Sequence, residues 1–285
     1  MPLEWLSPGE EALWRSNVRY GLPLYSALAV FWLLVRAAST FFWESCRFWN
    51  VVPSESKTKW HNDMTTSSFA WLAVATAAYA LFVLDELDAL EERRFAASNA
   101  HYIISGVGFS YFVYDLGYLC WTREFGYAGA AVLLHHFLFI FSYTVSMLYP
   151  STASMRGMYY WCLTDASTIP LHLVWFFEKA QVTGLPLIVA GFTLVAVFGV
   201  RCCLGVIALY HQNTLVFRHD LWSFPTPPQL AAAFPSVPWP AVVRAYVLVH
   251  TFFPWVMAAL NFYWWSKVVS RGLRVFRAVR TSGRP

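Results

Sequence analysis

Long apolar stretches, each close to the length that crosses a bilayer, constrain this chain more than any other feature. The hydrocarbon layer is about 30 Å thick and a helix rises about 1.5 Å per residue, so one crossing takes roughly 20 apolar residues. Only 13% of the residues are charged and 58% are hydrophobic, whereas about a quarter of a soluble domain is charged. The sequence therefore predicts an all-α membrane protein built as a bundle of about seven transmembrane helices. The expected spans are roughly 21–43, 65–85, 101–121, 126–148, 161–177, 185–210 and 241–266.

The fifth expected span, 161–177, is short and unusually polar. Its polar or helix-disturbing residues are Thr164, Asp165, Ser167, Thr168, Pro170 and His172. Irregular backbone at membrane depth is tolerated only where it is buried in protein or lines a cavity. We therefore expect either a short span or a broken or re-entrant segment inside the bundle, which leaves six or seven spans.

Basic residues gather after the last expected span. They are Lys267, Arg271, Arg274, Arg277, Arg280 and Arg284. Lysine and arginine concentrate in cytoplasmic segments, so this tail is expected to be cytosolic. With seven spans the 44–64 loop lies on the same side and adds Arg47, Lys57 and Lys59. No RNA- or DNA-binding motif accompanies this charge, so nucleic acid is not an expected partner.

Ionisable residues at membrane depth are the first candidates for a functional site. They are Asp115 in the third span, His135 and His136 in the fourth, Asp165 with His172 in the fifth, and Arg201 in the sixth. A charged residue at a helix centre costs roughly 2.5–3.5 kcal/mol on insertion scales, so it tends to face the bundle interior and a partner. These positions therefore predict a polar pocket among the helices.

His135 and His136 give the sharpest signal, because they lie near the middle of the apolar segment LLHHFLFIFSY. Ser142 and Tyr143 follow them by seven positions and share their respective helix faces. Imidazole acts as a base, nucleophile or acid near neutral pH, which suits acyl transfer. The alternative is a pair of neutral histidines hydrogen-bonded between helices.

Asp115 lies between two tyrosines on one expected helix face. Tyr111 precedes it by four positions and Tyr118 follows it by three, so their hydroxyl groups are expected to solvate the carboxylate. The alternative is a purely structural contact with a histidine or arginine. Asp165, near the start of its span, is either part of the site or a helix cap. Arg201 either snorkels or pairs with one of the acids.

Metal-dependent and hydrolase chemistries lack their usual motifs. The sequence has no HExxH or GxSxG, and its remaining histidines show no HxxH spacing. The five cysteines lie in or beside apolar stretches without CxxC spacing. We therefore predict no metal site.

Four motifs in order carry a resemblance to a known family. They are KWHNDMTTSSFAW at 59–71, GFSYFVYDL at 108–116, HH at 135–136 and LTDASTIPLHLVWFF at 163–177. Together they resemble the TLC-domain family, which includes ceramide synthases, the translocating-chain-associating membrane protein and small lipid-linked proteins. The resemblance covers about residues 60–270, which would make 1–59 an N-terminal segment with the first span and 271–285 a basic cytosolic tail. The last motif is closer to the non-synthase branch, because Thr168 stands where synthases have a second aspartate.

The resemblance implies a role in lipid metabolism in the endoplasmic reticulum or a related membrane. His135 and His136 would be catalytic and would transfer an acyl group from acyl-coenzyme A to an amphipathic membrane lipid. Asp115 and Asp165 would orient the imidazoles, as a carboxylate does in serine-type triads. The expected substrate-binding residues are Tyr111, Tyr118, Ser142, Tyr143, Thr168 and His172.

Two other functions compete with acyl transfer. A non-catalytic lipid sensor or regulator of membrane composition would keep the same pocket for binding. A proton-coupled transporter is disfavoured, because no inverted repeat or pair of broken helices is visible. Acyl-coenzyme A is expected only as a co-substrate, no other cofactor is predicted, and the oligomeric state stays open.

Overall fold

The computed structural model describes residues 8–84, 98–122, 125–149, 151–218 and 235–282, and these residues form helices and short connections. The α-helices are α1 (Pro8–Ser16), α2 (Leu22–Glu44), α3 (Ser54–Phe82), α5 (Asn99–Thr122), α6 (Phe125–Leu148), α7 (Thr152–Thr164), α8 (Thr168–Lys179), α9 (Leu185–Arg218) and α11 (Trp239–Ser282). A π-helical turn covers Asn17–Gly21, and 3-10 turns cover Arg47–Val51 and Asp165–Ser167. The all-α prediction is confirmed.

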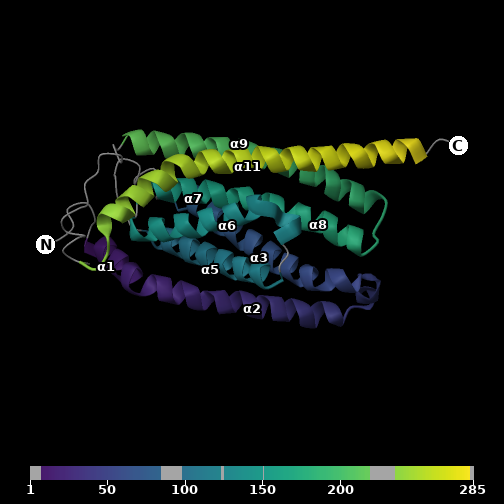
Figure 1. Cartoon of the computed structure of the whole chain (residues 1–285), viewed down its shortest axis with the longest axis horizontal. Helices are drawn as coiled ribbons and strands as arrows, with labels where there is room; N and C mark the ends of the chain where they lie inside the picture. Colours follow the sequence, from purple (N-terminus) through teal and green to yellow (C-terminus); the bar gives the residue numbers. More distant parts are fainter. Residues whose placement is uncertain (1–7, 85–97, 123–124, 150, 219–234, 283–285) are drawn as a thin grey trace.

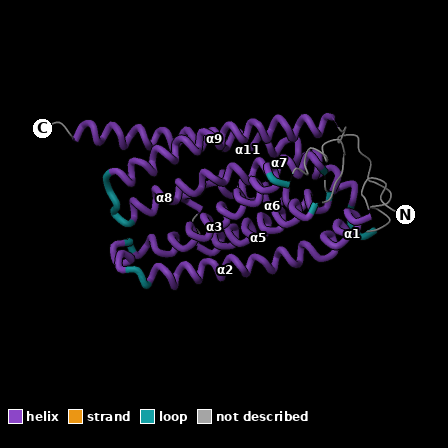
Figure 2. Tube along the Cα trace, turned by 180° about the vertical axis from the view of Figure 1, so that it is seen from behind, coloured by secondary structure: helices purple, strands orange, loops and turns teal. Residues whose placement is uncertain are grey.

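The long helices lie side by side along one axis, and the described connections gather at the two ends (Figures 1 and 2). Six helices in the described part of the chain are long and apolar enough to cross a membrane. They contain Pro23–Glu44, Ser54–Phe82, Asn99–Thr122, Gly129–Leu148, Leu185–Arg218 and Trp239–Leu273. The chain is therefore an integral multi-pass membrane protein, as predicted.

The fifth expected span is a broken segment. It consists of α7, the 3-10 turn Asp165–Ser167 and α8, and neither helix alone has the length of a span. Both helices contact α3 on one side and α9 on another, and they follow one another along the bundle (Figure 1). The segment thus runs through the bundle interior in two pieces, and α7 begins at Thr152, earlier than the expected 161.

Several helices extend beyond the apolar stretches that predicted them. The helix α3 begins at Ser54 although its apolar part begins near 65, and α11 has 44 residues. At about 1.5 Å per residue α11 is roughly 66 Å long, about twice the hydrocarbon thickness. Hydropathy locates the part of a helix that lies in lipid, whereas the backbone remains helical into the polar region.

Polar and apolar residues are distributed as expected for a lipid solvent. Large apolar side chains with more than 70% of their surface exposed occur on four of the long helices: Phe41, Phe82, Trp121, Leu185 and Phe192. Buried residues, in contrast, include His61, Asn62, Asp63, His101, Asp115, His136, Asp165, His172, Arg201, Gln212 and His250. The bundle therefore turns its apolar surface outward and encloses its polar groups.

Glycines on α5 allow the neighbouring helices to approach. A Cβ atom at Gly106 would lie 2.1 Å from Cε1 of Tyr25 on α2, and one at Gly108 would lie 2.4 Å from Cζ of Tyr143 on α6. Next to these contacts Phe69 stacks on Tyr111 at 3.9 Å between ring centroids. This close packing brings α3, α5 and α6 together around the candidate site.

Candidate functional site

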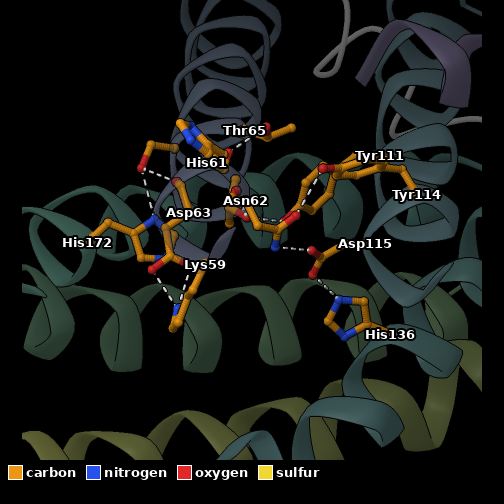
Figure 3. A network of polar contacts seen from close by, with 12 residues as sticks. Lys59, His61, Asn62, Asp63, Thr65, Tyr111, Tyr114, Asp115, His136 and His172 are labelled. Atoms are coloured by element: carbon orange, nitrogen blue, oxygen red, sulfur yellow. Dashed lines mark hydrogen bonds and ion pairs between the residues drawn. The ribbon is translucent and has the colours of Figure 1, made fainter. Parts of the chain in front are cut away.

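Asp115 is the centre of a buried polar network between α3, α5 and α6 (Figure 3). Asn62 donates from Nδ2 to Oδ1 of Asp115 at 2.8 Å, and Tyr114 donates its hydroxyl to Oδ1 of Asn62 at 3.0 Å. The other carboxylate oxygen, Oδ2, lies 2.7 Å from Nε2 of His136. A carboxyl group that is removed from water needs such partners, and here each of its oxygens has one.

Both ring nitrogens of His136 are engaged. Its Nδ1 lies 2.8 Å from the carbonyl oxygen of Val132, and a carbonyl only accepts, so Nδ1 must carry a proton. The contact between Nε2 and Asp115 is then either an imidazolium–carboxylate pair or a neutral imidazole that accepts from a protonated carboxyl group. In both states His136 has no nitrogen left for a substrate.

His135 has quite different surroundings. Its ring lies in an aromatic enclosure, with ring centroids 5.4 Å from Phe112, 4.7 Å from Phe139 and 5.5 Å from Trp264. Its Nδ1 is buried and has no hydrogen-bond partner in the described part of the chain. Buried polar atoms are nearly always paired, so an unpaired imidazole nitrogen requires an explanation.

A second polar group lies on a neighbouring face of α3, where Asp63 faces α8 (Figure 3). Lys59 contacts both carboxylate oxygens of Asp63 at 2.5 Å, and Nε2 of His172 lies 3.9 Å from Oδ1. Ser67 donates its hydroxyl to the carbonyl of Asp63 at 2.8 Å and therefore accepts from Nδ1 of His172 at 2.9 Å. The predicted site residue His172 thus belongs to this group and not to the histidine pair.

Asp165 begins the 3-10 turn between α7 and α8 and is buried. Asp165 stands at the C-cap position of α7, but its carboxylate makes no hydrogen bond or ion pair with a described residue. Its charge interacts with that of Arg201, which donates to Oδ1 of Asn261 at 2.7 Å and to Oγ of Ser167 at 2.9 Å. The structure therefore places Asp115, but not Asp165, in contact with a histidine of the pair. Arg201 is buried and does not snorkel toward the membrane surface.

The predicted tyrosine partners of Asp115 make other contacts. Tyr111 donates to Oγ1 of Thr66 at 2.9 Å, and the ring of Tyr118 lies 5.4 Å from the guanidinium carbon of Arg36. No hydrogen bond from either hydroxyl to Asp115 is present. Asn62 is instead the donor to Oδ1 of Asp115.

The remaining predicted substrate-binding residues divide between two places. Ser142 and Tyr143 on α6 border a cavity inside the bundle. Thr168 is half-buried at the start of α8, away from that cavity. Neither Ser142 nor Thr168 has a side-chain hydrogen bond to a described residue.

Residue-by-residue reasoning missed Asn62, Asp63 and Lys59. The signal was present, since polar side chains recur along α3 at Lys59, Asn62, Asp63, Thr66 and Ser67. Spacings of three and four positions place them on neighbouring faces of one helix. A search for this period within a span would have found them.

A family model for the TLC domain matches residues 59–270. The chain belongs to the TLC-domain family. The matched region contains most of α3, the helices α5 to α9 and most of α11, and with them both polar groups of Figure 3. Neither the curated proteins nor the solved structures yield a match.

The histidine, cysteine, aspartate and glutamate residues of the described ranges form no group of three or more that could hold a metal ion. The TLC-domain site described above consists instead of one coupled acid–imidazole pair with an unpaired imidazole beside it. The ring centroids of the two histidines are 5.6 Å apart.

Proposed function

We propose that this TLC-domain protein acts in lipid metabolism in the endoplasmic reticulum or a related membrane, and that it transfers an acyl group from acyl-coenzyme A to a membrane lipid. The observation that carries the proposal is the unequal state of the two histidines. His136 is fixed by Asp115 and by the backbone, whereas His135 keeps an unpaired buried Nδ1. His135 is therefore the reacting imidazole, and His136 is a positioning residue.

The reaction requires one base that also returns a proton. The imidazole of His135 takes the proton from the hydroxyl or amine of the acceptor lipid, and the acceptor atom attacks the thioester carbonyl carbon. The carbon–sulfur bond breaks, and coenzyme A leaves as a thiol after His135 gives the proton to the sulfur. General acid–base catalysis of this kind contributes typically 10²–10⁴-fold to a rate.

An acyl-transfer assay on the purified protein in lipid nanodiscs tests the proposal. The assay uses radiolabelled acyl-coenzyme A and a panel of lipid acceptors. His135→Ala should lower kcat by about 10²-fold or more, whereas His136→Gln, which retains a polar partner for Asp115, should retain measurable turnover. Equal turnover by the wild type and a His135→Ala/His136→Ala double variant would refute the proposal.

One observation favours the alternative, a lipid sensor or regulator of membrane composition that does not catalyse. The cavity inside the bundle is lined by neither His135 nor His136. This alternative predicts co-purified lipid that mass spectrometry identifies, and no turnover by the wild type with any acceptor. Acyl transfer by the wild type at a rate above that of the double variant excludes it.

A further inference from the structure

The candidate site lies closer to one end of the bundle than to the other. On α3, Asn62 is eight residues from the start of the helix and twenty from its end. On α5, which runs in the opposite direction, Asp115 is seven residues from the end of the helix and sixteen from its start. At about 1.5 Å per residue, both side chains lie roughly 10–12 Å from the nearer end of their helices and roughly 24–30 Å from the farther one. The nearer end is the one with the connections 45–53 and 180–184 (Figure 1).

The proposed acyl donor gives this asymmetry a chemical meaning. Acyl-coenzyme A carries a pyrophosphate and a 3′-phosphate, and its pantetheine arm joins these phosphates to the thioester. A charged group is strongly disfavoured in hydrocarbon, so the phosphates must stay in the polar region while the arm and the thioester enter the bundle. The shorter path from the site to water leads to the nearer end. The phosphates are therefore expected at that end.

That end carries a row of tryptophan rings with lysine ammonium groups above them. The ring centroids of Trp49 and Trp60 are 5.8 Å apart, and those of Trp60 and Trp175 are 5.9 Å apart. The ammonium nitrogen of Lys57 lies 4.9 Å from the ring centroid of Trp49, and that of Lys179 lies 5.9 Å from the ring centroid of Trp175. Cation–π contact of this kind holds a flexible lysine in place without neutralising its charge.

Lys57 and Lys179 have no counter-charge in the part of the chain that the structure describes. Neither lysine forms an ion pair there, and both are half-buried. Lys59 differs from them, because it lies over Trp175 but contacts both carboxylate oxygens of Asp63 at 2.5 Å. Lys57 and Lys179 are thus the two cations of this row that are available to a ligand.

The carboxylates described at this end leave the two lysines unneutralised. Glu178 pairs with Arg271 instead, at 2.6 Å between Oε2 and Nη2. Glu44 and Glu55 are exposed and form no ion pair with either lysine. Ammonium groups are common ligands of phosphate, to which they donate charge-assisted hydrogen bonds.

We propose that Lys57 and Lys179 bind the phosphates of acyl-coenzyme A while its thioester extends to His135. The inference rests on the proposed function in taking acyl-coenzyme A to be the donor, and it adds the place where the nucleotide part of the donor is held. The two lysines bind the donor and take no part in making or breaking a bond. Their rings, Trp49 and Trp175, keep the ammonium groups in position.

Binding of coenzyme A alone tests this inference without turnover. The full-length protein in nanodiscs of phosphatidylcholine is titrated with coenzyme A by calorimetry. We expect Lys57→Gln/Lys179→Gln to weaken binding roughly tenfold, because two charge-assisted contacts are lost. Added salt should weaken binding to the wild type more than binding to this variant. Absence of binding to the wild type, or equal affinity of the two proteins, would overturn the inference.

Two control variants separate this binding from general effects of charge and folding. Lys57→Arg/Lys179→Arg keeps both charges and should bind coenzyme A within a few-fold of the wild type. Arg244→Gln removes an exposed charge near the start of α11, at the other end of the bundle, and should leave the affinity unchanged (Figure 1). Equal weakening by Arg244→Gln would mean that overall charge, and not the two lysines, attracts the ligand.

Lipid headgroups offer the same phosphate chemistry, and a second measurement distinguishes the two sources. The wild type and Lys57→Gln/Lys179→Gln are purified from membranes with phosphatidylserine, and mass spectrometry counts the lipid that each retains. We expect equal retention by both proteins. Loss of retained phosphatidylserine from the variant together with unchanged affinity for coenzyme A would assign the lysines to lipid and refute the inference.

The binding site and the proposed reaction can fail separately. If no acceptor is acylated but coenzyme A binding depends on the two lysines, the reaction is wrong and the binding site remains. If acyl transfer occurs, Lys57→Gln/Lys179→Gln should raise the KM for acyl-coenzyme A about tenfold with little change in kcat, because neither lysine touches the reacting atoms. An unchanged KM in that active variant would refute the binding site alone.

Discussion

The side chains of His135 and His136 leave α6 about 100° apart, because the helix has 3.6 residues per turn. His136 thereby reaches Asp115 on α5, while His135 turns toward Trp264 on α11 and remains within contact of Phe112. Two adjacent residues of the same type thus have different hydrogen-bonding states. The distinction decides which of them is free to react.

Asn62 fixes the other side of Asp115, and its loss should destabilise the protein. Asn62→Leu removes the donor to Asp115 and the acceptor for Tyr114 while it keeps the side-chain size. A buried group left without its partner costs about 1–3 kcal/mol, and more if the group is charged. Thermal unfolding of the purified protein in detergent should therefore show a lower Tm than for the control Asn213→Leu, whose amide bonds only within its own helix. Equal Tm values for the two variants would contradict the pairing.

At this scale the sequence predicted which polar residues face the interior but not how they pair. Burial of Asp115, His136 and Asp165 follows from the cost of charge in lipid. Their partners depend on how α3, α5 and α6 are rotated relative to one another. The pattern of residues along a single helix gives no information about that rotation. For that reason Asn62 takes the place that Tyr111 was expected to fill.

At the scale of elements, helix packing in lipid depends on close contact, and α5 shows this at its glycines. Gly108 faces Tyr143 on α6, whereas a Cβ atom added at Gly117 on the same helix would meet no atom within 4 Å.

The spans and their order were predictable from the length of the apolar stretches. The break between α7 and α8 was predictable only in outline, because polar residues and Pro170 disfavour a uniform span but do not specify a 3-10 turn.

Gly108→Ala should separate α5 from α6 and lower stability. The added Cβ would lie 2.4 Å from the ring of Tyr143, and overpacking in a closely packed interior costs typically 1–3 kcal/mol. Gly117→Ala is the matched control and should be neutral or slightly stabilising, because alanine favours helix and meets open space. Unfolding of both variants in the same detergent checks this prediction. The prediction is wrong if Gly108→Ala unfolds at the same temperature as the wild type.

For the whole molecule, the arrangement of charges and connections agrees with one orientation in the membrane. The connections 45–53 and 180–184 and the end of α11 lie at the same end of the bundle, and α1 lies at the other (Figure 1). The broken segment of α7 and α8 supplies the additional pass that separates the two ends of the chain. Because basic residues favour the cytosolic side, we expect the end of the bundle at which α11 ends to face the cytosol.

Tags at the two ends of the chain should therefore report opposite sides. In sealed microsomes, protease should remove a C-terminal tag directly and an N-terminal tag only after detergent is added. Cysteine labelling refines the result. In a variant without other cysteines, an impermeant maleimide should label a cysteine at Gln181, which is exposed in the 180–184 connection, under the same conditions in which it labels one at the C-terminus. Six crossings would instead place both tags on one face, and that outcome would mean that α7 and α8 enter and leave the bilayer on the same side.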